Sequence, residues 1–175
     1  DISSGTSPDC NGNGVPDECD LAPSIGLPLA SIVGADNQVL EIGESVALWD
    51  ADLDGDLDVV VPAQGYLVLF PNDGKGRLGP GRPILLPQGP GAGILTAADV
   101  DGNGQKALVG AGTGIIVVRP SRTGAFEVSS GPEVSDYQVA IVAEDFDGDG
   151  HADVATASHM FPEGLVTIFM NDGNG

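Results

Sequence analysis

The chain has 175 residues, a hydrophobic content of 41% and a formal net charge of −20 at pH 7. The length and the hydrophobic content suffice for a domain with a core. The charge, with only six Lys and Arg residues, argues against nucleic-acid binding and against direct attachment to anionic lipid. No apolar run reaches the ~20 residues of a membrane-spanning helix, so we expect no direct membrane insertion.

The first predicted element is an acidic loop, DCNGNGVPDECD, within a small N-terminal domain at residues 1–26. It fits the twelve positions of an EF-hand calcium loop, with Gly14 at position 6. Cys10 and Cys19 lie within it and predict a local disulfide and an oxidising compartment. Two free thiols, or a disulfide-closed turn without metal, are the alternatives. The candidate ligands are Asp9, Asn11, Asn13, the Val15 carbonyl, Asp17 and Asp20.

Three similar segments then follow along the chain, and the first aspartates of their acidic loops lie 49 and then 46 residues apart. Each segment predicts a strand, an acidic loop, a second strand, a Gly-containing turn, a third strand and a turn rich in Gly, Asn and Asp. One more short strand is expected at 84–86, and segment 27–42 is expected to play the same part ahead of the first unit. The repeat units are approximately 27–78, 79–126 and 127–175.

The predicted strands are short runs of β-branched and aromatic residues bounded by turn residues. No helix is predicted, because 27 Gly and 13 Pro interrupt most helical patterns. The runs that carry this prediction are 45–49, 58–61, 66–70, 115–118, 139–143, 153–157 and 165–170.

About four strands in every ~47 residues predict an all-β fold with β-propeller-like blades of four antiparallel strands. An all-β sandwich is the alternative. Closed propellers have about four to eight blades. We therefore expect the ring of about three repeats to be incomplete in this chain. Either further sequence beyond residue 175 completes it, or the open edge strand pairs with another chain, which makes assembly with other copies a hypothesis.

Two of the acidic loops read D-x-D-x-D-G-x-x-D. Calcium takes ~6–8 oxygen ligands, and carboxylates at positions 1, 3 and 5 of a tight loop converge on one point. Gly at position 6 permits the turn, position 7 offers its backbone carbonyl, and the ninth Asp completes the shell. The alternative is a solvated acidic turn, in which each carboxylate pair at ~4 Å repels by roughly 1 kcal/mol in water. The candidate ligands are Asp50, Asp52, Asp54, Asp56 and Asp58, and Asp145, Asp147, Asp149, His151 and Asp153.

The second loop of the repeats is a weaker candidate for metal binding. It has Ala107 at position 9, and Lys106 brings a positive charge beside the site. A low-affinity calcium site and a decayed loop that still makes the turn are both open. The candidate ligands are Asp99, Asp101, Asn103 and Gln105.

The repeats resemble the FG-GAP/VCBS family on the strength of DADLDGDLDVVV and DFDGDGHADVAT, each followed by a third strand and an NDG turn. This resemblance covers roughly 30–175 and implies integrin-alpha-like propeller blades with calcium in the first and third loops. It also implies extracellular adhesion or scaffolding, common in secreted bacterial proteins. The N-terminal loop is similar to a dockerin or thrombospondin type 3 calcium loop.

No catalytic motif accompanies these loops. His151 lies at a position that uses its backbone, and His159 follows Ser158 in a turn. Trp49 is expected to pack between blades, with a sugar-stacking role as the alternative. We therefore expect a secreted or cell-surface calcium-binding structural or adhesion protein that is not an enzyme. A carbohydrate-binding lectin-like module and an accessory domain of a larger secreted enzyme are the alternatives.

Overall fold

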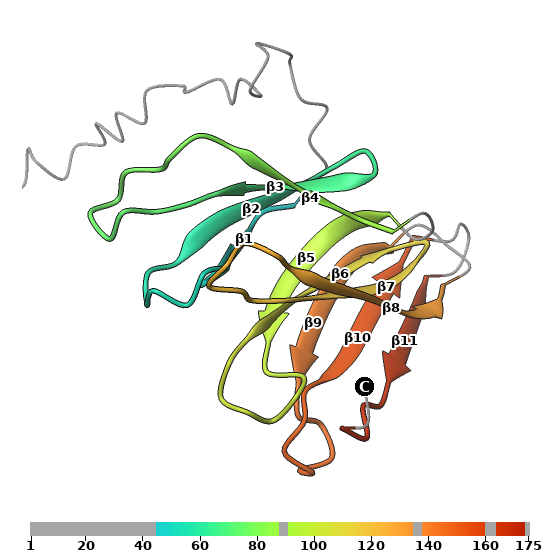
Figure 1. The fold of residues 1–175 in the computed structure, drawn as a ribbon. Helices are drawn as coiled ribbons and strands as arrows, with labels where there is room; N and C mark the ends of the chain where they lie inside the picture. The colour runs from blue at the N-terminus through green and yellow to red at the C-terminus, as the bar shows by residue number, and fades with distance from the viewer. Residues whose placement is uncertain (1–44, 88–90, 135–137, 160–163, 174–175) are drawn as a thin grey trace, which may run out of the picture. The chain divides into compact units, whose positions relative to one another are not determined.

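The computed structural model describes residues 45–87, 91–134, 138–159 and 164–173. The predicted N-terminal calcium loop, the Cys10–Cys19 disulfide and the strand segment 27–42 lie outside these ranges. The described residues all belong to one compact unit, Gly34–Gly175. Within them the chain forms eleven strands and no helix (Figure 1). Nothing in this described part is a helix of the length and apolarity that a bilayer crossing requires.

The strands form three antiparallel sheets, in which strands adjacent in sequence are paired. The prediction of an all-β fold with four-stranded antiparallel blades is confirmed, and the third sheet shows three strands in its described part. The first sheet contains β1 (Ala47–Trp49), β2 (Asp58–Ala63), β3 (Tyr66–Phe70) and β4 (Arg82–Leu85). The second contains β5 (Ala92–Ala98), β6 (Ala107–Gly112), β7 (Gly114–Arg119) and β8 (Glu127–Glu133). The third contains β9 (Gln138–Glu144), β10 (Asp153–Ser158) and β11 (Leu165–Phe169).

A two-residue turn joins the second and third strands of the first sheet. Strand β3 has the sequence YLVLF, whose β-branched and aromatic side chains suit a pleated, half-buried surface. Gln64 and Gly65 join it to β2, because Ala63 pairs directly with Tyr66. Gly65 has a φ of 79°, which a two-residue hairpin loop favours and which glycine adopts without steric cost.

The short strand predicted ahead of the second repeat unit belongs instead to the first sheet. Strand β4 pairs with β3, with Leu67 opposite Ile84, and β8 pairs with β7 in the same way. The turn after β3 is closed by Asp73, whose Oδ1 accepts hydrogen bonds from the backbone of Lys75 and Arg77 at 2.9 and 3.1 Å. This turn folds the chain back along β3, so the first and second sheets each extend one strand beyond the predicted repeat units.

Strand β6 of the second sheet is buried on both faces. On β6, Leu108 packs in a cluster with residues of the first sheet, including Val60. Its neighbour Val109 packs in another cluster with residues of the third sheet, including Val154. Successive side chains of a strand point to opposite faces, so a strand that lies between two sheets is apolar at every position. This arrangement explains the continuous apolar run ALV at the start of β6.

Trp49 lies between the first and second sheets, as predicted, with 1% of its surface exposed. Its ring packs against Phe126 with centroids 5.7 Å apart and a 45° angle between the planes. Its Nε1 donates a 2.8 Å hydrogen bond to the carbonyl of Lys106. The indole therefore joins two sheets and is not accessible for stacking on a sugar.

Candidate metal centre

The three acidic loops each connect the first strand of a sheet to the second (Figure 1). We name them loop one (50–58), loop two (99–107) and loop three (145–153). Loops two and three lie beside one another, since the backbone N–H of Ala152 donates a 3.1 Å hydrogen bond to the carbonyl of Asp99. Trp49, which directly precedes loop one, donates a 2.8 Å bond to the carbonyl of Lys106 in loop two. Sheet stacking thus gathers the acidic loops at one end of the strands.

The first aspartate of each loop organises the backbone of that loop. In loop one, Asp50 accepts hydrogen bonds from the N–H groups of Asp54 at 3.1 Å and Gly55 at 3.2 Å. The first aspartates of loops two and three accept equivalent bonds from positions 5 and 6. All three loops therefore have the same backbone turn, although their other side chains differ.

The glycine at position 6 has the backbone conformation expected from the sequence. Gly55, Gly104 and Gly150 have φ angles of 98°, 82° and 95°. Side chains rarely tolerate positive φ, whereas glycine does so without a Cβ penalty. The turn that brings positions 1, 3 and 5 together depends on these residues.

Position 4 is strained in loop one. Gly102 and Gly148 occupy this position in loops two and three, with φ angles of 62° and 83°, but loop one places Leu53 there at 61°. A left-handed conformation costs a non-glycine residue roughly 1–2 kcal/mol. Such strain is found preferentially at functional sites. The D-x-D-x-D-G pattern does not indicate this strain, because it leaves position 4 unspecified.

The carboxylates at positions 1, 3 and 5 converge in loops one and three. In each of these two loops, one oxygen from each of the three side chains lies within 4.8 Å of the others. Two oxygens that bind one calcium ion at ~2.3–2.6 Å are at most about 5 Å apart, so the spacing fits a single ion. The converging side chains are Asp50, Asp52 and Asp54, and Asp145, Asp147 and Asp149.

One oxygen in loop one provides an independent test of fit. Oδ1 of Asp52 is buried and has no hydrogen-bond partner. Buried polar oxygens in proteins are almost always satisfied, because leaving one unpaired costs free energy. A cation held between Asp52 and its two neighbours would satisfy this oxygen. The residues of loop one therefore fit a calcium ion, and the same spacing recurs in loop three with exposed carboxylates.

The ninth residue of loop one connects the loop to the turn after β3. Asp58 is 1% exposed. Its two oxygens accept hydrogen bonds from the N–H groups of Ala51 at 3.1 Å and Asn72 at 2.8 Å. Burial raises the pKa of Asp58, against the lowering effect of these two bonds, and the charges of Asp52 and Asp54 raise it further. The ionised carboxylate is thus held at an electrostatic cost, which a nearby cation would offset.

Asp153 has the same role in loop three, where it is fully buried. Its oxygens accept hydrogen bonds from the N–H groups of Phe146 at 2.9 Å and Asn171 at 2.7 Å. The Asn171 amide donates in turn to the carbonyls of Val100 at 2.7 Å and Ala152 at 3.2 Å. The ninth Asp and the Asn of the NDG turn therefore form one hydrogen-bonded unit, which explains why the two motifs recur together in the sequence.

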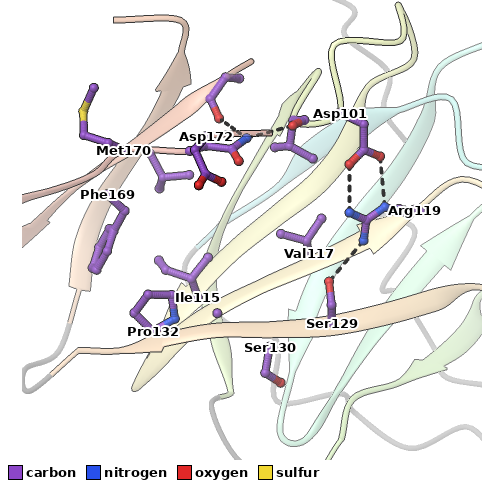
Figure 2. A pocket seen from close by; sticks show the side chains of 15 residues that line it. Asp101, Ile115, Val117, Arg119, Ser129, Ser130, Pro132, Phe169, Met170 and Asp172 are labelled. Atoms are coloured by element: carbon purple, nitrogen blue, oxygen red, sulfur yellow. Dashed lines mark hydrogen bonds and ion pairs between the residues drawn. The ribbon is translucent and has the colours of Figure 1, made fainter. Parts of the chain in front are cut away.

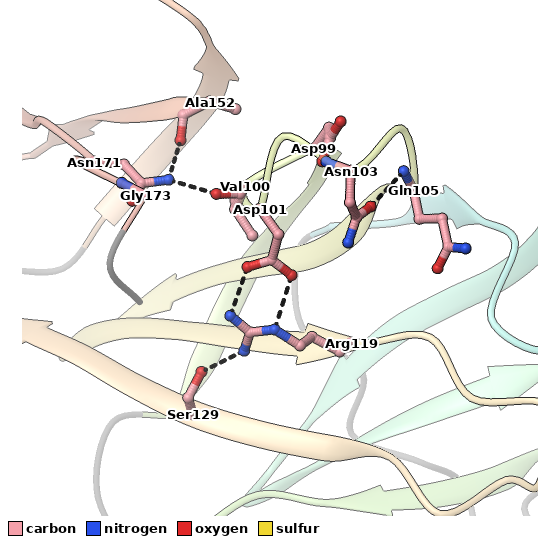
Figure 3. Close-up of polar contacts among 10 residues, drawn as sticks. All are labelled: Asp99, Val100, Asp101, Asn103, Gln105, Arg119, Ser129, Ala152, Asn171 and Gly173. Atoms are coloured by element: carbon pink, nitrogen blue, oxygen red, sulfur yellow. Dashed lines mark hydrogen bonds and ion pairs between the residues drawn. The ribbon is translucent and has the colours of Figure 1, made fainter. Parts of the chain in front are cut away.

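Loop two differs from its neighbours in its charges. Asp101 is paired with Arg119 from the end of β7, eighteen residues along the chain (Figure 3). The guanidinium donates from Nε at 2.9 Å and from Nη2 at 2.8 Å to the two carboxylate oxygens. The cation that pairs with loop two thus comes from a distant strand, whereas the sequence had pointed to Lys106.

The backbone N–H of His151 donates a 2.9 Å hydrogen bond to Oδ1 of Asp149. Its imidazole packs closely between loop two and the last described turn. A Cβ placed on Gly102 would lie 3.0 Å from the ring, and one placed on Gly173 would overlap it. The side chain therefore fills the space between two blades, and the glycines on both sides make room for it.

A groove of about 240 Å³ lies between the second and third sheets (Figure 2). Ile115, Val117 and Phe169 form its apolar part, and Asp101 and Arg119 lie at its polar end. The two charged side chains bond to each other rather than into the groove. Further polar residues line the groove, namely Ser129, Ser130, Asn171 and Asp172.

Two family matches cover the acidic loops. The FG-GAP-like repeat family matches residues 50–110, and the FG-GAP repeat family matches residues 138–169. No curated protein matches the sequence. The two matches support the expectation that this is an FG-GAP repeat protein.

Solved structures of larger proteins are similar to this chain. A chain of the Photorhabdus luminescens Tc holotoxin pore, in a TccC3 mutant form, has a TM-score of 0.46 and 18% identity over 73% of this chain. A chain in the crystal structure of TcdB2-TccC3 has a TM-score of 0.42 and 22% identity over 71% of this chain. The present chain spans 6% of the length of each.

Proposed function

We propose, from the premise that this chain is an FG-GAP repeat protein, that it is a secreted structural or adhesion protein whose acidic loops bind calcium. The observation that carries this proposal is the convergence of three carboxylates in loops one and three, together with the unpaired buried oxygen of Asp52. Binding of ions, and not catalysis, is the proposed role of these carboxylates.

In this proposal each ion is held by side chains at positions 1, 3, 5 and 9 and by the carbonyl at position 7. Oxygen-only ligands favour calcium over zinc or copper, and the flexible shell of calcium suits the loop better than the strict octahedron of magnesium. We extend the proposal to the N-terminal loop. In the repeats the ligands are Asp50, Asp52, Asp54, the Asp56 carbonyl and Asp58, and Asp145, Asp147, Asp149, the His151 carbonyl and Asp153.

Calcium would supply positive charge at two points of a strongly acidic chain. Without it, three aspartates at positions 1, 3 and 5 of each loop repel one another at short range. Because the ninth Asp connects each loop to the turn after the third strand, ordering one loop also orders that turn. Ion binding therefore contributes to folding stability.

The proposal includes a secreted location, which the same chemistry supports. Extracellular calcium modules bind their ion with dissociation constants of about 10⁻⁴–10⁻³ M, which matches calcium concentrations outside cells rather than inside. The expected Cys10–Cys19 disulfide also needs an oxidising compartment. Calcium and other protein chains are the proposed partners.

The first prediction concerns calcium itself. Titration of the chelator-stripped chain by calorimetry is expected to give two or more sites. Two loops at a hundredfold excess over their dissociation constants stabilise the fold by about 5 kcal/mol. This corresponds to a rise of roughly 10–20 °C in Tm for a chain of this size, which circular dichroism would record. Magnesium at the same concentration is the control, and an absence of binding at millimolar calcium would contradict the proposal.

Assembly with other copies is the second part of the proposal, and the exposed side of β11 supports it. In the described part of the third sheet, β11 is an edge strand paired on one side with β10. Its apolar side chains are largely exposed, among them Leu165 at 51%, Val166 at 67% and Ile168 at 56%. An apolar edge strand is a template for strand addition by another chain.

The second prediction tests this edge. Val166→Lys is expected to convert calcium-loaded multimers to monomers, because lysine on an edge strand blocks strand addition. Sedimentation velocity in calcium would measure the change. Leu85→Lys, at an exposed residue of the first sheet, is the matched control and should leave assembly intact. A wild-type chain that stays monomeric at all concentrations would rule out assembly.

A further inference from the structure

Loop two has the backbone of a metal loop but not the ligands. Asp99 accepts the same two backbone hydrogen bonds as the first aspartates of the other loops. Position 5 is the neutral Asn103, whose Oδ1 accepts a 2.8 Å bond from the N–H of Gln105. Position 9 is Ala107, which is 1% exposed and packs in the core. Loop two therefore lacks two of the carboxylates that the other loops present.

The remaining carboxylate at position 3 already has a cation. Arg119 binds both oxygens of Asp101, at 2.8 and 2.9 Å, and Ser129 accepts a 3.1 Å bond from Nη1 of the same guanidinium (Figure 3). The two side chains are 25% and 32% exposed. A bidentate pair of this kind is stronger and more directional than an ordinary surface ion pair. The hydrogen bond to Asp101 raises the pKa of Arg119, so the guanidinium stays charged.

The three position-3 aspartates thus have different partners. Asp52 has a buried oxygen without a partner, and Asp147 converges with two other carboxylates, whereas Asp101 is bound by Arg119. We infer that Arg119 takes the place of the calcium ion in loop two, and that this loop holds its shape without metal. The inference deepens the proposed function and rests on it for the contrast with loops one and three.

Loop two contacts both neighbouring sheets, so the replacement of calcium by Arg119 also affects how the sheets are held together. Its carbonyls accept hydrogen bonds from both neighbouring sheets: Lys106 from Nε1 of Trp49 and Asp99 from the N–H of Ala152. Loop two therefore links the two neighbouring sheets without calcium, whereas loops one and three depend on calcium. Removal of calcium loosens loops one and three and leaves these two hydrogen bonds of loop two in place.

Calcium stoichiometry of the full chain tests the inference at matched positions, and this is our third prediction. Asp52→Asn and Asp147→Asn are each expected to lower the number of bound calcium ions by one in calorimetry. Asp101→Asn, the same change in loop two, is expected to leave the number unchanged. A loss of one ion in Asp101→Asn would overturn the inference.

A double-mutant cycle without metal provides the second measurement. Urea unfolding in chelator would compare wild type, Asp101→Asn, Arg119→Met and the double variant. The coupling is expected to change the unfolding equilibrium constant about five- to tenfold, and a coupling below twofold would overturn the inference. If no variant binds calcium, the proposed function fails, and this cycle still decides whether Arg119 supplies the loop with its cation.

Discussion

Replacing Trp49 by alanine is expected to lower the free energy of unfolding by about 4 kcal/mol. This is our fourth prediction and the largest effect that we predict for a single residue. The side chain is 1% exposed and lies in the cluster that joins the first two sheets. The substitution leaves a cavity there and removes the contact with Phe126. Urea unfolding of the calcium-loaded chain would measure the loss.

Trp49→Phe separates packing from hydrogen bonding. Phenylalanine retains most of the apolar contact but leaves the carbonyl of Lys106 without its donor. This carbonyl is half-buried, and an unsatisfied acceptor away from water costs about 1–3 kcal/mol, so this variant should lie between wild type and Trp49→Ala. If Trp49→Ala lost less than 1 kcal/mol, Trp49 would not join the two sheets.

The fifth prediction concerns the ninth aspartate of loop three. Asp153→Ala is expected to destabilise the calcium-free chain by about 3–4 kcal/mol. It leaves the half-buried N–H groups of Phe146 and Asn171 without an acceptor, and an unsatisfied donor away from water costs ~1–3 kcal/mol. Because both bonds join protein groups only, the loss should be visible in chelator by urea unfolding.

Asp147→Ala is the matched control for this prediction. Asp147 is an exposed member of the converging group, and its change should abolish the calcium-dependent gain of loop three while leaving the calcium-free stability nearly unchanged. The opposite pattern, in which Asp153→Ala has no effect in chelator, would mean that Asp153 acts on stability through metal alone. The pair therefore separates the hydrogen-bonded unit from the ion site.

The sequence was sufficient for the regular parts of the fold. Runs such as YLVLF at Tyr66–Phe70 combine β-forming side chains with flanking turn residues, and β3 has these same bounds. The position-6 glycines were also predictable, because a tight acidic loop needs positive φ there and Gly55, Gly104 and Gly150 provide it.

Strand β8 could not be predicted from its residues. Glu127–Glu133 contains Gly and Pro and few apolar side chains, and most of it is exposed. It is an outer strand that is held by backbone pairing with β7, and backbone pairing leaves no periodic pattern in the side chains. The sequence also placed the strand at 84–86 in the second repeat unit. Only backbone pairing shows that β4 lies next to β3 in the first sheet.

The contacts of the candidate site depend on residues that are distant in sequence. The Asp101–Arg119 pair spans eighteen residues, and a single sequence does not show which cation of several will face a given loop. The recurrent Asn of the NDG turn was visible, but its bond to the ninth Asp was not. The spacing of the aspartates predicted the convergence of positions 1, 3 and 5, since the loop itself determines that geometry.

The strand order also bears on how the chain reaches its folded state. Every strand pairs with its neighbour in sequence, and β5 contacts strands of the sheets immediately before and after its own. Pairing between strands adjacent in sequence closes short loops, and contacts that are local in sequence form quickly. Each meander can close as soon as it emerges from the ribosome, and the next one then folds onto its exposed face. Vectorial folding of this kind limits the time for which apolar strands remain open to aggregation.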